Sequence, residues 1–234
     1  MIVYGVCAGP SGKFDRIAGP TIERIREQHD ELVVLKKQSS IFEAYNEVLR
    51  QARVHGDDLD AVVLIHDDVE VCDVDLPDKL RRLFSDVSIG VVGVIGASGV
   101  RSLEWWEYET HGLVREDRLG VIDFGAGTHD VDMVDGLFMA LSPAAAHILT
   151  FDERYGGFHG YDGDLCASAR AAGLRVVVAE IDVAHRTAGG YGDKAAFAAA
   201  DARFQQKWGV RPRGDRPGLR RRRWLRWTRL TASR

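Results

Sequence analysis

The chain has 234 residues, 45% of them hydrophobic and 28% charged, a balance that allows a sizeable core and argues against a wholly disordered chain. No stretch approaches the roughly 18 consecutive apolar residues that a membrane-spanning helix needs. The net charge of −4 is uneven, because residues 211–234 contain ten Arg and one Asp, a net +9, which leaves −13 on residues 1–210. An acidic body disfavours nonspecific binding to nucleic acid, so we expect no nucleic-acid partner, whereas a metal cation would suit this part of the chain.

The three cysteines, Cys7, Cys72 and Cys166, show no CxxC spacing. They cannot all pair with one another, which is typical of small buried thiols in a reducing compartment and excludes a zinc finger or a disulfide scaffold. The first residues also lack the charged region of a signal peptide. We therefore expect a cytoplasmic protein.

Short apolar runs alternate with amphipathic stretches in the first half of the chain. The runs are rich in β-branched residues without polar alternation, which predicts strands covered on both faces, at residues 2–8, 31–35, 61–65 and 90–95. Helical spacing of apolar residues predicts helices at residues 14–29, 41–54 and 77–84. This order predicts an α/β fold with a mostly parallel central sheet and helices on both faces.

The second half is less regular. Residues 98–128 carry several aromatics and glycines without a sustained period, which indicates a long functional loop. We predict strands at 131–141 and 174–179 and helices at 162–172 and 193–208. The sequence thus indicates a single domain over residues 1–210, followed by a basic and flexible tail over residues 211–234.

An acidic motif, His66-Asp67-Asp68, follows the predicted strand 61–65 directly. The carboxyl ends of strands are where open α/β sheets bind ligands. Two adjacent carboxylates repel each other and are costly to desolvate without a cation, and Mg²⁺ or Mn²⁺ binds such groups together with substrate phosphates. The motif therefore indicates a metal-nucleotide site; the alternative is a pair of solvated turn residues.

Several motifs in order carry a resemblance to a known family: FEAYNEVLRQA, LIHDDVEV, and DGLFMALSPAAAHILTFDERYGGFHGYDGDLCASARAAGLRVVVAEIDVAHRTAGG. Over residues 2–208 the chain resembles the GT-A fold glycosyltransferases of the large inverting family 2, especially its small glycosyltransferase-like branch. The resemblance implies a nucleoside diphosphate sugar as donor, a divalent metal, Mn²⁺ or Mg²⁺, and a saccharide or lipid-linked acceptor. It also implies inversion in a single in-line displacement.

The resemblance implies a role for each residue of the acidic motif. Asp68 takes the position of the family's metal ligand, and the late histidine of the family implies His185 as a second ligand. His66 replaces the usual first acid of the family motif, so we expect His66 and Asp67 to contact the nucleotide. For His185 the alternative is an ordinary core or loop histidine.

Asp162 takes the position of the family's catalytic base, where a carboxylate removes the proton of the acceptor hydroxyl. Tyr161 stands where the family has Glu, and we expect Tyr161 and Asp164 on the substrate side. Asp135 and Gly136 match the family's Asp-Gly at the acceptor-side strand and are expected to contact substrate. The alternative for Asp162 and Asp164 is capping of the helix that follows.

Six further positions complete the expected site. Residues 7–9, Cys7, Ala8 and Gly9, follow the first strand, where the family contacts base and ribose through its backbone. Asn46 resembles a family position near the nucleotide, although it can equally join helix to loop. Trp105 and Trp106 would stack on an acceptor sugar, or else pack the long loop.

The tail combines Arg220 to Arg223 with Trp224 and Trp227, a mixture found in segments that bind anionic membrane surfaces. We therefore expect peripheral attachment at the inner face of the membrane, with a solvated cationic end as the alternative. Two other functions stay open at this point. They are a noncatalytic nucleotide- or carbohydrate-binding module and a nucleotidyltransferase.

Overall fold

A mixed central sheet organises the protein. The computed structural model describes residues 1–187 and 192–211, and within these residues seven strands form one sheet. In spatial order they are β2 (Glu31–Lys36), β1 (Ile2–Ala8), β3 (Ala61–His66), β11 (Phe138–Leu141), β5 (Ile89–Gly93), β12 (Arg175–Val178) and β9 (His129–Val131). Only β11 and β9 run against the common direction, since β11 pairs antiparallel with both β3 and β5 and β9 pairs antiparallel with β12. The predicted α/β class is confirmed, with a sheet that is mixed.

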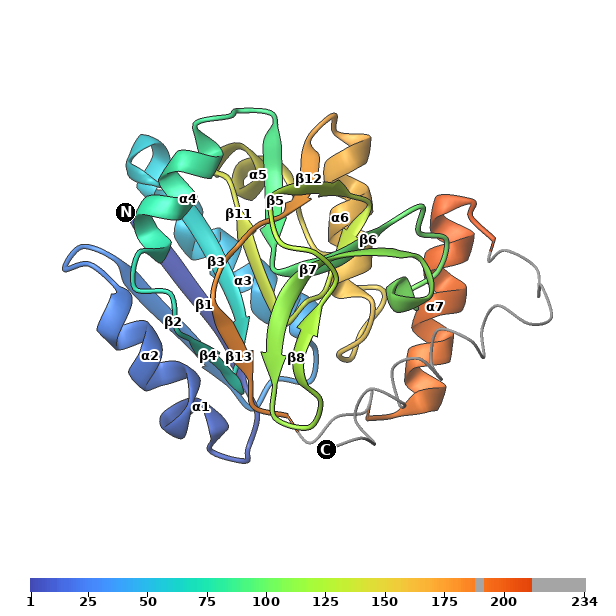
Figure 1. The fold of residues 1–234 in the computed structure, drawn as a ribbon, viewed down its shortest axis with the longest axis horizontal. Helices are drawn as coiled ribbons and strands as arrows, with labels where there is room; N and C mark the ends of the chain where they lie inside the picture. Colours follow the sequence, from blue (N-terminus) through green and yellow to red (C-terminus); the bar gives the residue numbers. More distant parts are fainter. Residues whose placement is uncertain (188–191, 212–234) are drawn as a thin grey trace.

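A second sheet lies against the first, in front of it in Figure 1. Its strands within the described residues are β10 (Met133–Val134), β6 (Ile95–Ser98), β7 (Glu109–Glu116), β13 (Val183–His185) and β4 (Val69–Val71), with β8 (Gly120–Asp123) paired to β7. Only Asp67 and Asp68 separate β3 of the first sheet from β4 of the second. The acidic motif therefore forms the sharp turn at which the chain passes between the two sheets.

Helices cover both faces of the central sheet, as predicted. The helices of the described residues are α1 (Lys13–Arg16), α2 (Ala18–Ile25), α3 (Ile41–Ala52), α4 (Leu76–Phe84), α5 (Pro143–Ile148), α6 (Tyr161–Ala171) and α7 (Lys194–Trp208), with 3₁₀ turns η1 (Arg53–Asp58) and η2 (Trp105–Glu107). Successive residues of a strand face opposite sides. Accordingly Val62 and Leu64 of β3 pack with α3, α5 and α6, whereas Val63 and Ile65 pack with α2, α4 and the second sheet.

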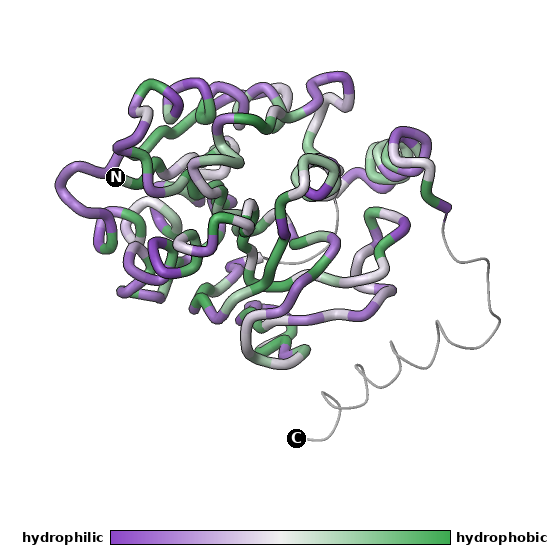
Figure 2. The backbone as a smooth tube through the Cα atoms, turned by 90° about the horizontal axis from the view of Figure 1, so that it is seen from above, coloured by the Kyte–Doolittle hydropathy of each residue, from purple (hydrophilic) through white to green (hydrophobic). Residues whose placement is uncertain are grey.

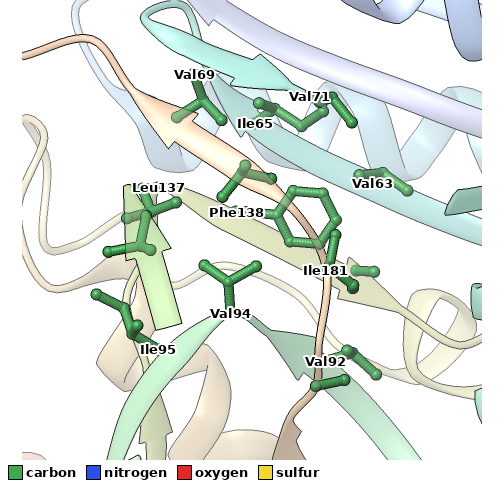
Figure 3. Close-up of a cluster of buried hydrophobic side chains, with 14 of the residues drawn as sticks. Val63, Ile65, Val69, Val71, Val92, Val94, Ile95, Leu137, Phe138 and Ile181 are labelled. Carbon is green, nitrogen blue, oxygen red and sulfur yellow. The ribbon is translucent and has the colours of Figure 1, made fainter. Parts of the chain in front are cut away.

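The side of the central sheet that faces the second sheet holds the larger apolar cluster. Figure 3 shows the Phe138 ring of β11 pointing into the group that also contains Val63, Val94 and Ile181, all nearly inaccessible to solvent. Hydrophilic stretches gather along the outer helices and loops in Figure 2. No helix of the described residues combines the length and the apolar character needed to cross a membrane.

Two predictions about the elements were wrong. Residues 98–128 contain β7 and β8, although we predicted an irregular loop. Residues 131–141, which we predicted as one strand, hold the last residue of β9 and the whole of β10 and β11. In β7 only two of eight residues are fully buried, and Gly112 at φ 96° interrupts the alternation, with the Val94 carbonyl oxygen 2.1 Å from where its Cβ would be. An exposed strand with such an interruption lacks the apolar period on which the prediction depended.

The predicted helix 14–29 is also different, because it is divided into α1 and α2 at Ile17 and ends at Ile25. At the other end, α7 ends at Trp208, close to the predicted end of the domain. Most of the predicted basic tail, residues 212–234, lies outside the described residues, and with it the expected membrane contact.

Candidate functional site

Strand direction brings the predicted site residues to one edge of the central sheet. The carboxyl ends of β1 and β3 lie there, since Cys7 pairs with His66 in parallel register. Because β11 runs antiparallel to β3, the residues that precede it, Asp135 and Gly136, reach the same edge. The backbone N–H of His66 donates to the Leu137 carbonyl at 3.1 Å and ties the two segments together.

Three potential metal ligands meet at this edge. The ligand atoms of His66, Asp68 and His185 lie within 4.8 Å of one another. His185 comes from the end of β13, which pairs with β4 so that His185 lies opposite Val69, next to the acidic turn. Two imidazole nitrogens and one carboxylate suit a divalent transition metal such as Mn²⁺. The predicted ligands Asp68 and His185 are thus adjacent, and His66, which we expected at the nucleotide, stands beside them.

Burial and neighbouring charges favour the metal-binding form of His66 and Asp68 but the protonated form of His185. Burial, together with the neighbouring His185, lowers the pKa of His66 and keeps its ring neutral, which is the form that binds a metal. Burial alone would raise the pKa of Asp68, but its contacts with His185 and Lys13 hold that pKa well below its usual range. Burial likewise opposes protonation of His185, yet the hydrogen bond to Asp68 outweighs it and raises the His185 pKa.

Tyr161 holds the His66 ring in place. Its hydroxyl lies 2.5 Å from His66 Nε2, and burial raises the pKa of Tyr161 so that the hydroxyl keeps its proton. Gly136 makes this arrangement possible, because a Cβ at that position would be 2.1 Å from Tyr161 Oη. We expected Gly136 to contact substrate. In the structure, the group that lies against Gly136 is the phenol of Tyr161.

Asp162, in the first turn of α6, has the properties of a general base. Its Oδ2 accepts the backbone N–H of Gly136 at 3.1 Å, and its Oδ1 accepts that of Gly163 at 2.8 Å. Burial, followed by the negative charge of Asp135, raises the pKa of Asp162 to about 7 in spite of these hydrogen bonds. A carboxyl with a pKa near the working pH can both accept and release a proton.

Two residues of this site were not foreseen. Lys13 Nζ lies 2.8 Å from Asp68 Oδ2, and Glu116 Oε1 at the end of β7 lies 3.9 Å from His185 Nδ1. The Glu116 Oε2 atom is buried without a hydrogen-bond partner, and burial raises the pKa of this carboxyl. Lys13 could have been found from its position, because it directly follows the glycine-containing turn after β1. Glu116 could not, because it belongs to a strand that we had predicted as loop.

The expected nucleotide contacts after β1 adjoin the acidic turn. The backbone N–H of Gly9 donates to Asp67 Oδ2 at 2.8 Å, and Ala8 is 3% exposed. Burial, with the charge of Asp67, raises the pKa of the Cys7 thiol to about 11, so it is not a thiolate at neutral pH. Backbone groups of this turn can meet a ligand at the edge where Asp67 and Asp68 lie.

Asn46 and Asp164 make contacts that join elements. Asn46 donates from Nδ2 to the Phe151 carbonyl at 3.0 Å and accepts the Phe151 N–H at 2.8 Å, which fastens α3 to the segment after α5. Asp164 accepts from Lys207 Nζ at 2.8 Å and from Trp208 Nε1 at 2.9 Å, both in the last turn of α7. These contacts occupy the polar atoms that were expected to face nucleotide and substrate.

The two tryptophans pack edge to face. Their ring centroids are 5.9 Å apart, and Trp105 is 6% exposed and belongs to the core. Trp106 is partly buried and lies 6.0 Å from Phe197 of α7. The structure thus places Trp105 in the core. Trp106, which belongs to η2 and faces α7, keeps part of its ring exposed.

Comparison with known proteins points to one group. A family model described as "Glycosyltransferase like family" matches residues 21–200. The streptomycin biosynthesis protein StrF of Streptomyces griseus is 36% identical over 192 residues, which cover 81% of this chain and 68% of that protein.

Solved structures match as well. The structure titled "Crystal Structure of A197 from STIV" gives a TM-score of 0.53 at 14% identity and covers 80% of this chain and 85% of that chain. The mannosyltransferase PcManGT from Pyrobaculum calidifontis, solved in complex with GDP-Man and Mn²⁺, gives 0.50 at 12% identity and covers 81% of this chain and 58% of that chain. At these identities the likeness is one of fold.

Proposed function

Because this chain belongs to the glycosyltransferase-like family, we propose that it moves a sugar from a nucleoside diphosphate sugar to an acceptor hydroxyl, with inversion and with a divalent metal. Its likeness to the mannosyltransferase confirms the predicted GT-A fold, and membership of the family supports a glycosyltransferase. The metal, the donor and the inversion are the proposed part. One observation carries them: His66, Asp68 and His185 converge at the sheet edge, close to the first turn of α6, which contains Asp162.

The donor set supports Mn²⁺ over Mg²⁺. Mg²⁺ is bound mainly through oxygen, whereas Mn²⁺ also accepts imidazole nitrogen. With two histidines beside one aspartate, Mn²⁺ is the better match. When bound, the metal would stabilise the negative charge that develops on the leaving diphosphate.

The chain's own residues supply the remaining chemistry. The hydrogen bonds from Gly136 and Gly163 aim the Asp162 carboxylate, which takes the proton of the acceptor hydroxyl as that oxygen attacks the anomeric carbon. Attack on the face opposite the leaving diphosphate inverts the anomeric centre in one displacement. Tyr161 orients the His66 ring through its hydrogen bond, as groups beyond the ligands do in metal sites, and Glu116 adds a carboxyl 3.9 Å from His185 Nδ1.

A thermal-shift experiment tests this function. UDP, GDP and TDP sugars are added with and without Mn²⁺, and GDP-mannose with Mn²⁺ is the first pair to try. We expect one donor to raise the melting temperature only when Mn²⁺ is present, because a ligand at about 100 times its Kd stabilises the folded state by roughly 2.7 kcal/mol. Turnover with an acceptor should release nucleoside diphosphate and no pyrophosphate.

Two variants sharpen the test. Asp68→Asn should abolish the Mn²⁺-dependent shift, whereas Asp73→Asn, which changes another buried aspartate that is paired with a lysine, should keep it. A shift that persists in Asp68→Asn, or that needs no metal in the unchanged protein, would contradict the proposed metal site.

A further inference from the structure

Lys13 forms an ion pair with Asp68, the proposed metal ligand. Its Nζ lies 2.8 Å from Asp68 Oδ2, and His185 Nε2 lies 3.3 Å from Oδ1 of the same carboxylate. Asp68 is 8% exposed, whereas the side chain of Lys13 is 36% exposed. The proposed metal ligand is thus paired with an ammonium group that solvent can reach from outside.

Lys13 reaches Asp68 from the side on which we expect the nucleotide. It is the first residue of α1, directly after the turn that follows β1. The same turn is bound to the acidic motif a second time, through the hydrogen bond from Gly9 to Asp67. A ligand bound along this turn would lie within reach of the Lys13 side chain, which has four flexible carbons and three N–H donors.

Charge makes the present contact incompatible with a bound metal. A divalent ion held by Asp68 and His185 would add two positive charges beside the ammonium, on the same carboxylate, and like charges this close repel strongly in a partly buried site. A diphosphate brings negative oxygens to the same place, and an ammonium binds these well. Lys13 therefore has a better partner than Asp68 once donor and metal are both present.

We propose that Lys13 exchanges partners during donor binding: it neutralises Asp68 in the free enzyme and competes there with the metal, then pairs with the donor diphosphate. This inference rests on the proposed function. Its consequence is thermodynamic coupling, because the nucleotide withdraws the competitor and so strengthens metal binding, and the metal strengthens nucleotide binding to the same degree.

The variant Lys13→Met tests the exchange through two binding constants. Binding of Mn²⁺ alone, followed by electron paramagnetic resonance, should become about two- to fivefold tighter, the scale of one partly exposed ion pair. Binding of UDP, GDP or TDP at saturating Mn²⁺, followed by calorimetry, should become roughly tenfold weaker, the scale of one charged hydrogen bond. The two effects have opposite signs.

Lys79→Met is the matched control, because Lys79 has a 35% exposed side chain and pairs with Asp73, whose side chain is 5% exposed. Both binding constants should be unchanged in this variant. Thermal unfolding of both variants without ligand checks that each is folded.

The other outcomes are also informative. Tighter Mn²⁺ binding with unchanged nucleotide binding would make Lys13 a counter-ion only, and weaker binding of both would make it a structural support; either result overturns the exchange. If the unchanged protein binds neither Mn²⁺ nor any of the three nucleotides, the proposed function itself fails.

Discussion

At the scale of single residues, Asp162 combines a restrained position with an unusual acidity. Its two oxygens accept backbone N–H groups of Gly136 and Gly163, and burial with the charge of Asp135 raises its pKa to about 7. A raised carboxyl pKa means that the folded state binds the proton more tightly than the unfolded chain. Through this group, stability is therefore greatest at low pH and is lost as the pH rises through about 7.

Asp162→Asn separates catalysis from capping. We expect kcat to fall by about 10²–10⁴-fold, because the amide cannot accept the proton, while nucleotide binding is retained. The free energy of unfolding at neutral pH should change by no more than about 1 kcal/mol, since the variant no longer buries a charge but turns an amide NH2 toward one of the two backbone N–H groups that the carboxylate accepts. A steady-state assay measures kcat, and urea unfolding measures the free energy of unfolding. If the variant lost stability but kept kcat, Asp162 would be a helix cap and not the base.

The pH profile of the unchanged protein checks the same residue. As the base must be ionised, kcat/KM should fall about tenfold for each pH unit below about 6 and level off above about 8. A profile that is flat across this interval would contradict Asp162 as the base.

At the scale of elements, Asp164 fastens α7 to α6. Its side chain is 2% exposed and accepts from Lys207 and Trp208, while Tyr155 Oη lies 3.3 Å away. On the same helix, Asp201 accepts the Leu103 N–H at 2.7 Å and so connects α7 to the segment before η2. Helix α7 thereby supports the loop side of the site.

Asp164→Ala should lower the free energy of unfolding by about 2 kcal/mol, because it leaves the Trp208 N–H without its partner and removes one of the two carboxylates that pair with Lys207. Gln206→Ala, an exposed change on the same helix, should alter it by less than about 0.5 kcal/mol. Chemical denaturation measures both. If Asp164→Ala instead kept full stability and raised only the KM for the acceptor, the expected substrate role of Asp164 would be supported.

At the scale of the whole molecule, the two sheets share one core. Phe138 of β11 is fully buried in a cluster with Val71 of β4, Val94 and Ile181. The site lies where the sheets meet, so its geometry depends on this cluster. Such a shared core predicts that the described residues unfold as one unit.

Phe138→Ala should lower the free energy of unfolding by about 3–5 kcal/mol, since it leaves a large cavity between the sheets. The matched change Phe158→Ala removes a ring that is 49% exposed and should cost no more than about 1 kcal/mol. Tryptophan fluorescence and far-UV circular dichroism should report one coincident transition. Two separate transitions would mean that the sheets unfold independently.

Local patterns predicted the buried part of the fold. Continuous β-branched runs located β1, β2, β3, β5 and β12, and amphipathic spacing located α3 and α4; helices were also predicted close to the observed bounds of α6 and α7. Such elements carry their own apolar period, so a single sequence is enough to find them. The position of Asp67 and Asp68 at a strand end followed from the same reasoning.

Pairing between distant segments was decided by the tertiary structure alone. β7 and β8 have little apolar period, because they are stabilised by neighbouring strands at the surface, and Glu116 was missed with them. Lys13 on Asp68 and Tyr161 on His66 join residues that are 55 and 95 positions apart. The sequence by itself determined that the acidic motif lies at a strand end. Only the packing of the two sheets and α6 decided which side chains touch it, because those contacts depend on long-range geometry that no local period encodes.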